Sequence, residues 1–265
     1  MKNIQTLKVD SFTCWRLNNI HKYGEFNWLQ LNYDPITADI MHIIIEVKEK
    51  INTEPEELKN RIEKQLKRPI PIYILDFNNP ESKYYVDVNN LHKKIGLVIN
   101  EHSLKNIKNV KSYWEYRLHT KPQNCLTADI DVLEHNNKIN LFILIEAAQL
   151  YNTKNLNEAI EHIFKTFKFR KNQVNVLQYK SHVKLAKLLE AKAYILFHEI
   201  ENRKLKDDRE CLLLNNDDFF IEMLIDIREY GKNDLYKFLN QYRDDLIKRM
   251  KQFKNIDEAY KYLIK

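Results

Sequence analysis

Two runs of strand-forming residues, at 126–133 and 139–145, lie on either side of the polar segment 135–138. This arrangement predicts a β-hairpin that turns within the polar segment. The second run contains five consecutive apolar residues, at 141–145, which is typical of a strand buried on both faces. We therefore expect the chain to fold around a buried β-hairpin.

Carboxylates lie at the positions where this hairpin can bring them together. Asp129 and Asp131 belong to the first run, and Glu146 directly follows the second. The hairpin places Asp131 and Glu146 roughly opposite each other on strands about 5 Å apart, which is close enough to share a cation. A carboxylate at the end of a buried strand is costly to ionise unless a metal or a positive side chain compensates it. The sequence therefore predicts a shared cation site.

This pattern resembles the core of the PD-(D/E)XK nuclease superfamily, which includes many type II restriction endonucleases. Its members carry an Asp on one strand and Glu-X-Lys at the end of the next. The resemblance covers about residues 111–200 and implies that Asp131 and Glu146 bind Mg²⁺ or Mn²⁺, with Asp129 as the substitute for Asp131. The backbone carbonyl of Ala147 is expected to complete the oxygen ligands.

The resemblance also implies a catalytic lysine at position 148, where this chain has Ala148. One explanation is that the protein has lost or relocated its lysine, with Lys154 and Lys180 as candidates. The other is an engineered variant in which a lysine at this position was replaced to inactivate the enzyme. The second is favoured because a lysine would complete an ordinary active motif. Alanine at this position removes the charge of the lysine but leaves both metal ligands, so we expect DNA binding to persist while cleavage falls.

The order of elements around the hairpin is also similar to the superfamily. Apolar spacing at 156–167 predicts a helix, and a second helix is expected at about 173–190, carrying Gln178 and Tyr179. A strand at 193–197 follows. Upstream, residues 113–118 are expected to be helical, and Glu115 occupies the place where several families carry an additional acid, which implies an outer-sphere or second-metal contact.

The rest of the chain predicts a mixed α/β fold: a restriction-endonuclease-like mixed sheet flanked by helices. We expect three regions: an N-terminal α/β region at 1–105, the nuclease-like core at 106–215 and C-terminal helices at 216–265. After an irregular start, strands are predicted at 26–33, 40–47, 69–75, 84–88 and 95–99, with a helix at 54–67. Beyond the core we expect a strand at 211–214 and helices at 218–230, 234–253 and 256–264. The last helices are candidates for a homodimer contact or a substrate contact.

A second motif competes with the first. Glu46-Val47-Lys48 is a complete Glu-X-Lys, and the upstream sequence Thr-Ala-Asp-Ile occurs both at 37–40 and at 127–130. Asp39 and Glu46 lie on one extended segment, so they are expected to be roughly 20 Å apart and unable to share a metal. Asp34, beyond a turn, could reach in principle. An edge strand ending in solvated charges fits this segment better.

Composition excludes several classes of protein. Three glycines are too few for the Gly-rich loops of P-loop and dinucleotide-binding proteins. The net charge of +6 is compatible with a polyanionic partner. Three widely spaced cysteines form neither a zinc pattern nor a disulfide framework, which favours a reducing cytoplasm. No signal peptide or apolar segment of roughly 20 residues is present, so we expect a cytoplasmic protein without a membrane contact.

Two segments combine basic and aromatic residues, at 165–171 and 248–254. On a nuclease these are candidate phosphate contacts, although such runs more often form the solvated face of a helix over a buried aromatic ring. The nine histidines form no metal-spaced pair, and most are expected at the surface or in turns.

Together these patterns predict a metal-dependent endonuclease that hydrolyses DNA. The alternative is a nuclease-like fold without catalysis that binds nucleic acid or acts as an assembly subunit. RNA as the substrate stays open, because no pattern here indicates readout of bases or 2′-hydroxyls.

Overall fold

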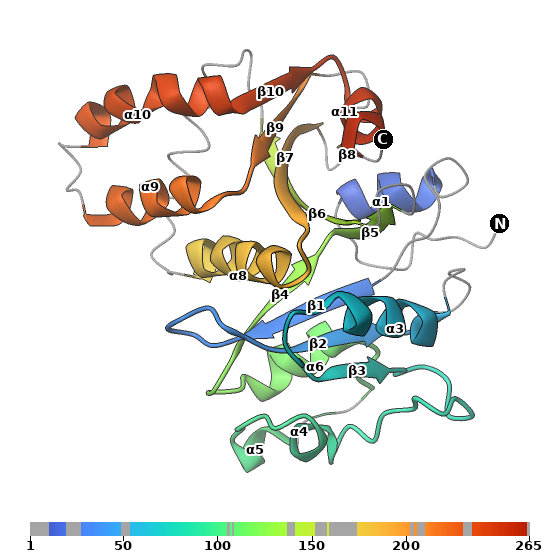
Figure 1. The fold of residues 1–265 in the computed structure, drawn as a ribbon. Coiled ribbons are helices and arrows are strands. Elements are labelled where there is room, and N and C mark those ends of the chain that lie inside the picture. Colours follow the sequence, from blue (N-terminus) through green and yellow to red (C-terminus); the bar gives the residue numbers. More distant parts are fainter. Residues whose placement is uncertain are drawn as a thin grey trace.

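A computed structural model of the chain describes residues 11–19, 28–48, 54–104, 107, 109–136, 141–151, 158, 174–201, 204–205, 210–229 and 235–263. The predicted mixed α/β class is confirmed, because the strands form two mixed sheets with helices packed on their faces (Figure 1). The helix predicted at 156–167 lies outside the described residues, apart from residue 158.

The first sheet has the strand order β3-β2-β1-β4. Its strands are β1 (Trp28–Tyr33), β2 (Ile40–Glu46), β3 (Ile72–Leu75) and β4 (Leu126–Ile130). β1 and β2 form an antiparallel hairpin, and α3 (Pro55–Gln65) leads from β2 to the parallel strand β3. β4 pairs antiparallel with the free side of β1. These elements confirm the predicted strands at 26–33, 40–47 and 69–75 and the helix at 54–67.

The second sheet has the order β10-β9-β7-β6-β5, with β8 added to β7. Its strands are β5 (Val132–Asn136), β6 (Leu141–Tyr151), β7 (Lys192–Glu201), β8 (Lys204–Leu205), β9 (Cys211–Asn215) and β10 (Met250–Phe253). β5 and β6 are the predicted antiparallel hairpin, and α8 (Val174–Leu188) precedes β7, which pairs parallel to β6. The predicted order of hairpin, helix at 173–190 and strand is therefore confirmed, and the structure shows that this strand is parallel to β6.

The two sheets are joined at Asp131. β4 ends at Ile130 in the first sheet, and β5 begins at Val132 in the second, so a single residue separates them. The run at 126–133, predicted as one strand, is thus divided between two sheets. The chain bends here without glycine or proline.

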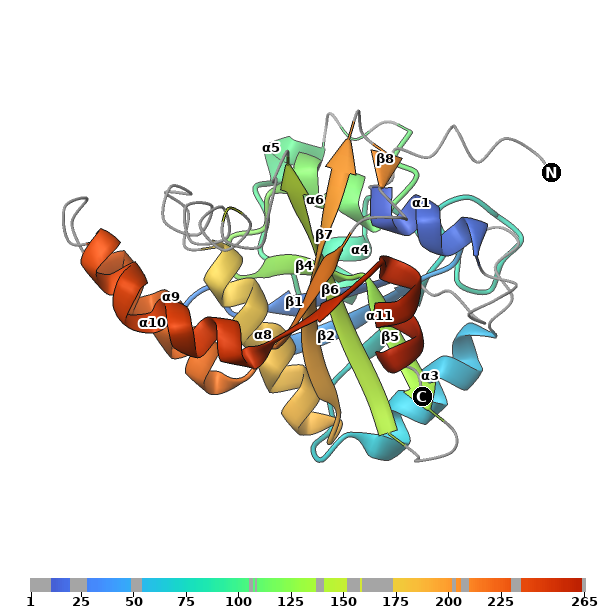
Figure 2. The ribbon, with the colours of Figure 1, turned by 90° about the horizontal axis from the view of Figure 1, so that it is seen from above.

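α8 lies between the two sheets (Figures 1 and 2). Val176 and Val183 pack into the hydrophobic core of the second sheet, whereas Leu185 and Leu189 pack with α3 against the first sheet. α9 (Asp218–Glu229) and α10 (Leu235–Arg249) extend the core beside α8. α8 is therefore held by both halves of the molecule.

The outer faces of the two sheets carry other helices. α1 (Ser11–Asn18) and α11 (Ile256–Leu263) pack on the second sheet. α4 (Leu91–Lys94) and α6 (Tyr113–Thr120) pack on the first, close to the short helix α5 (Glu101–Leu104). The helices predicted at 113–118, 173–190, 218–230 and 256–264 and the strands predicted at 193–197 and 211–214 are confirmed.

Four other predictions about secondary structure are wrong. The N-terminal segment, predicted to be irregular, contains α1, because Phe12 and Trp15 gain a buried site on the second sheet. Residues 84–88 and 95–99 are not strands; turn hydrogen bonds such as Tyr85 N–Ser82 O hold the first, and a left-handed Gly96 interrupts the second. The helix predicted at 234–253 ends at Arg249, because β10 pairs with the open edge of β9.

The division into three regions stays a prediction, although α6 and β4 pack with the N-terminal sheet rather than with the second. Cys125 and Cys211 are buried free thiols. Among the described helices, none has the length and apolar character needed to cross a bilayer.

Candidate functional site

Asp131 and Glu146 lie next to each other at the start of the hairpin. The β5–β6 register pairs Val132 with Ile145, so the next positions outward are Asp131 and Glu146. The Asp131 carboxylate accepts a hydrogen bond from the Ala147 backbone N–H, with 2.6 Å between Oδ2 and N. The predicted proximity of these two acids is confirmed.

The apolar run before Glu146 explains why the strand lies where it does. Phe142 and Leu144 enter the core shared with the first sheet, and Ile143 and Ile145 enter the core on the opposite face. The predicted burial on both faces is therefore confirmed. Glu146 does not end the strand, however: β6 continues to Tyr151, because β7 pairs with it along this whole stretch.

Two side chains of α8 approach the Glu146 carboxylate. Gln178 Nε2 donates a hydrogen bond to Oε1 at 2.7 Å, and His182 Nδ1 lies 3.7 Å from Oε2. Gln178 and His182 are four residues apart, so they share one face of the helix. Glu146 itself is largely covered, with 13% of its side chain exposed.

His182 is fully buried, and burial lowers its pKa to about 4, against a smaller opposing contribution from the backbone carbonyl of Asp129. The imidazole is therefore neutral at pH 7, and its contact with Glu146 is not an ion pair. The ring therefore interacts with the Asp129 backbone as well as lying beside the Glu146 carboxylate.

Tyr33 of β1 contributes a second buried polar group near this acid. Its hydroxyl finds no hydrogen-bond partner among the residues that the structure describes. Burial raises the pKa of the Tyr33 phenol, and although Arg117 opposes the shift, the negative charge of Glu146 adds to it. Glu146 and Tyr33 therefore affect each other electrostatically.

The other residues of the predicted site lie in different surroundings. Asp129 is exposed, between the buried residues Ala128 and Ile130, whereas Asp131 accepts the hydrogen bond from Ala147 N. Ala148 packs against the hydrophobic core of the second sheet. Lys180 is two residues from Gln178, roughly 200° around the helix, so it does not share the face that meets Glu146. Lys154 lies outside the described residues.

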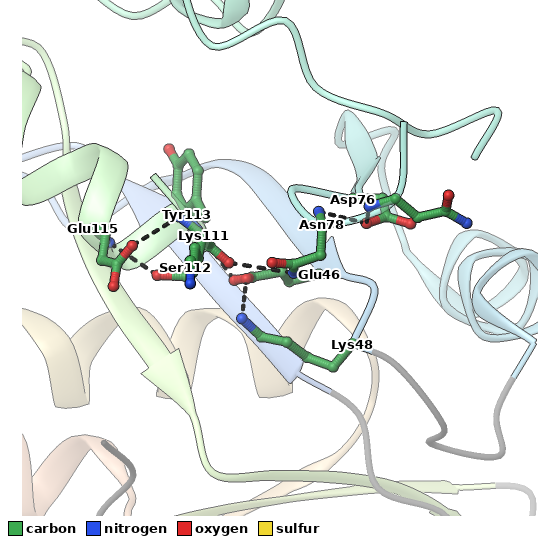
Figure 3. A network of polar contacts seen from close by, with 9 residues as sticks. Glu46, Lys48, Asp76, Asn78, Lys111, Ser112, Tyr113 and Glu115 are labelled. Carbon is green, nitrogen blue, oxygen red and sulfur yellow. Dashed lines mark hydrogen bonds and ion pairs between the residues drawn. The ribbon is translucent and has the colours of Figure 1, made fainter. Parts of the chain in front are cut away.

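Glu115 closes the N-terminus of α6. Its carboxylate accepts a hydrogen bond from Lys111 N at 2.7 Å, while its own N–H donates to the Ser112 hydroxyl at 3.1 Å (Figure 3). This is a helix cap. α6 packs on the face of the first sheet opposite α8, beside Glu46. The structure does not bring Glu115 to Asp131 and Glu146.

The competing Glu-X-Lys motif forms a buried ion pair. Glu46 is 5% exposed, pairs with Lys48 and accepts a hydrogen bond from Tyr113 N at 3.2 Å (Figure 3). The interpretation as an edge strand ending in solvated charges is wrong, because β2 lies between β1 and β3.

Neither aspartate proposed for that motif reaches Glu46. Asp39 pairs with Lys184 of α8 at 2.6 Å, and Asp34 accepts hydrogen bonds from the backbone of Ile36 and Thr37 in the β1–β2 turn. Both therefore lie at the opposite end of β2, about 20 Å from Glu46 by strand length. The predicted separation of Asp39 from Glu46 is confirmed.

Among the described histidines, His42, His182 and His198 are buried, because each lies on an inward face of a strand or helix. In the segment 248–254, Arg249 pairs with Asp217 at 2.7 Å and Lys251 lies over the ring of Tyr262. The segment 165–171 lies outside the described residues.

The oxygen atoms near Glu146 are of the kind that serves as ligands of Mg²⁺. The described residues hold no group of three or more His, Cys, Asp or Glu side chains arranged around a metal position. Mg²⁺ is commonly bound through one or two carboxylates, with waters and substrate phosphates completing the shell. Asp131, Glu146 and the Ala147 carbonyl therefore fit such an ion. Sequence reasoning missed His182 and Tyr33; the four-residue spacing of Gln178 and His182 was the one available signal.

Comparison with known proteins identified no relative of this chain. No protein-family model matches the chain, and no curated protein or solved structure is significantly similar to it.

Proposed function

We propose that the chain has the fold of a metal-dependent DNA endonuclease of the PD-(D/E)XK type, in a form impaired by Ala148. The observation that carries the proposal is the hydrogen bond from Ala147 N to Asp131, which places two carboxylates at the start of one hairpin. The succession of β5, β6, α8 and β7, with β7 parallel to β6, supports the same class.

Each residue of the site has a definite task in this proposal. Asp131 and Glu146, with the Ala147 carbonyl, would hold Mg²⁺ or Mn²⁺, and such an ion activates water and stabilises charge on a phosphate when it is bound. Gln178 orients the Glu146 carboxylate through its 2.7 Å hydrogen bond. Ala148 lies two residues further on the same face of β6, so a lysine there would add a positive charge beside the acids.

A cleavage assay tests the proposal. Plasmid DNA, single-stranded DNA and RNA are incubated with Mg²⁺ or Mn²⁺ and either the parent or the Ala148→Lys variant. We expect Ala148→Lys to cleave at least one substrate about a hundredfold faster than the parent, because removal of a transition-state charge contact commonly costs 10²–10³ in rate. Asp131→Asn or Glu146→Gln in the lysine background should abolish that cleavage.

Gln149→Lys provides a matched control. It adds the same charge one residue further along β6, on the opposite face of the strand. This variant should remain as inactive as the parent. The nuclease proposal fails if Ala148→Lys cleaves no nucleic acid, or if Gln149→Lys activates the protein equally.

One observation favours a second function, that of a nucleic-acid-binding or assembly subunit without catalysis. Ala148 is packed against the hydrophobic core, so a small apolar residue fits the site as it stands. Fluorescence anisotropy distinguishes the two functions: a binding subunit would bind DNA or RNA with equal affinity in the parent and in Ala148→Lys, while neither protein cleaves.

A further inference from the structure

The positive charge of the chain is concentrated in residues 91–124. This segment contains seven lysines and arginines but only two acids, Glu101 and Glu115, so it carries a net charge of +5 out of the +6 of the whole chain. It forms α4, α5 and α6, which share the outer face of the first sheet (Figure 1). An electrostatic field of one sign on one face of a protein attracts polyanions.

Four lysines of this segment are exposed and have no acid partner. Lys93 and Lys94 end α4, Lys111 precedes α6, and Lys121 is its C-cap. Within the described part of the chain, no carboxylate forms an ion pair with any of these ammonium groups. The nearby acid Glu115 accepts its hydrogen bond from the backbone N–H of Lys111, not from the side chain. The four charges are therefore available to an anionic partner.

Large apolar side chains are exposed on the same helix. Trp114 and Leu118 of α6 are 45% and 56% exposed, and their four-residue spacing places them on one face of the helix. The fully buried Tyr113 and Tyr116 hold α6 on the sheet, so the exposed pair is not required for that packing. An exposed apolar patch with a charged rim is typical of a binding surface.

The combination of an indole ring and unpaired lysines selects among polyanions. Trp114 forms no contact with another aromatic ring of the described residues, and α6, whose two ends carry Lys111 and Lys121, is only eight residues long. In single-stranded nucleic acid the bases are free to stack on aromatic side chains while the phosphates bind cationic groups. A duplex attracts the same lysines but keeps its base faces stacked inside.

We propose that the outer face of α6 binds single-stranded nucleic acid, with a base stacked on Trp114 and neighbouring phosphates at Lys111 and Lys121. α6 packs on the face of the first sheet opposite α8, so this surface is separate from the candidate metal site. The inference goes beyond the proposed function, because it adds a second contact with nucleic acid and requires no metal.

The test measures the affinity of the full chain for a fluorescein-labelled oligothymidylate of about 20 nucleotides, by fluorescence anisotropy in EDTA. Trp114→Ala should weaken binding roughly tenfold, because it removes one stacked base. Trp114→Phe retains a flat ring and should bind within about threefold of the parent. The double substitution Lys111→Gln/Lys121→Gln should reduce the slope of log affinity against log salt by about 1.4, since each phosphate contact contributes about 0.7.

Tyr262→Ala is the matched control. Tyr262 of α11 is 47% exposed, and the Lys251 ammonium lies 3.6 Å from the centre of its ring, but it belongs to the second sheet. Its replacement should change the affinity less than twofold. Thermal unfolding of each variant identifies a loss of folding, and the salt dependence of the double lysine variant carries the test if Trp114→Ala does not fold.

Three results would overturn the inference. The first is equal affinity in the parent and Trp114→Ala, and the second is an equal loss in Tyr262→Ala. The third is equal competition by unlabelled oligothymidylate, duplex DNA and polyglutamate, which would show that the surface attracts any polyanion.

The two proposals fail in different assays. Cleavage by Ala148→Lys without a Trp114-dependent affinity for the oligonucleotide would overturn this inference alone. Trp114-dependent binding in EDTA, with no cleavage by Ala148→Lys in Mg²⁺ or Mn²⁺, would overturn the nuclease proposal and support a binding subunit.

Discussion

Arg16 of α1 is buried and forms an ion pair with the largely covered Glu134 of β5, although the two are 118 residues apart in the sequence. Tyr260 of α11 donates its hydroxyl proton to the same carboxylate, and the Arg16 guanidinium lies 4.7 Å from the centre of the Tyr260 ring. Three distant segments are thus joined on one face of the second sheet.

The Arg16–Glu134 pair predicts that the stability losses of the two single variants do not add up in the double variant. Arg16→Met should lower the free energy of unfolding by about 3–5 kcal/mol, because it leaves the Glu134 carboxylate buried without its cation. The double variant Arg16→Met/Glu134→Leu should recover at least half of that loss. Urea unfolding of the parent, both single variants and the double variant measures the coupling. Additive losses would show that the two side chains do not interact.

His42 predicts a loss of stability in acid. Burial lowers its pKa to about 4, whereas in the unfolded chain the pKa is about 6.5. As the pH falls from 6.5 toward 4, the unfolded chain binds a proton that the folded protein excludes. Roughly 2 kcal/mol should therefore be lost from this residue between pH 6.5 and pH 5.

Urea unfolding at pH 7 and pH 5 measures this effect. The His42→Gln variant should lose about 2 kcal/mol less than the parent over that interval. Equal losses in the two proteins would show that His42 takes up its proton in the folded state at the ordinary pH.

The buried carboxyl of Glu46 predicts a loss of stability as the pH rises, which is opposite in sign to the effect of His42. Burial raises the pKa of this carboxyl despite the nearby Lys48 ammonium, so the folded protein binds this proton more tightly than the unfolded chain does. As the pH rises above the ordinary glutamate pKa, the unfolded chain releases its proton first, and the folded state loses stability. Glu46→Gln should therefore gain stability relative to the parent between pH 4 and pH 7.

Glu56 supplies the comparison for that measurement. It is an exposed acid whose pKa is lowered, chiefly by the hydrogen bond from the Tyr84 hydroxyl. Its lowered pKa makes the parent gain stability over Glu56→Gln as the pH rises. The same trend in both variants would contradict the assignment for Glu46.

The sequence is sufficient to predict the hairpin of β5 and β6. Five apolar residues before Glu146 require burial on both faces, and the polar segment before them allows one compact turn. Counting from a turn at the centre of that segment would place Asp131 opposite Phe142. The β5–β6 register, in which Asn136 pairs with Leu141, places it opposite Glu146 instead. The hairpin thus follows from local pattern, but the register that joins the two acids does not.

The rest of the site depends on packing that no local pattern records. The bend at Asp131 is marked by no glycine or proline, and the residues around it have ordinary strand character. The contact between His182 and Glu146 exists because α8 packs between two sheets. Residues 84–88 resemble a strand in composition, yet their backbone forms a single β-bridge to Asp76 and a turn hydrogen bond from Tyr85 N to Ser82 O instead of a strand.

The position of Asp131 between β4 and β5 has a mechanical consequence. A change in the angle between the two sheets must turn the backbone at this residue, whose side chain is attached to β6 through Ala147. A cation that Asp131 shares with Glu146 would therefore stabilise one angle between the two sheets. By thermodynamic linkage, any partner that holds the sheets at the same angle would in turn raise the affinity of the site for the cation.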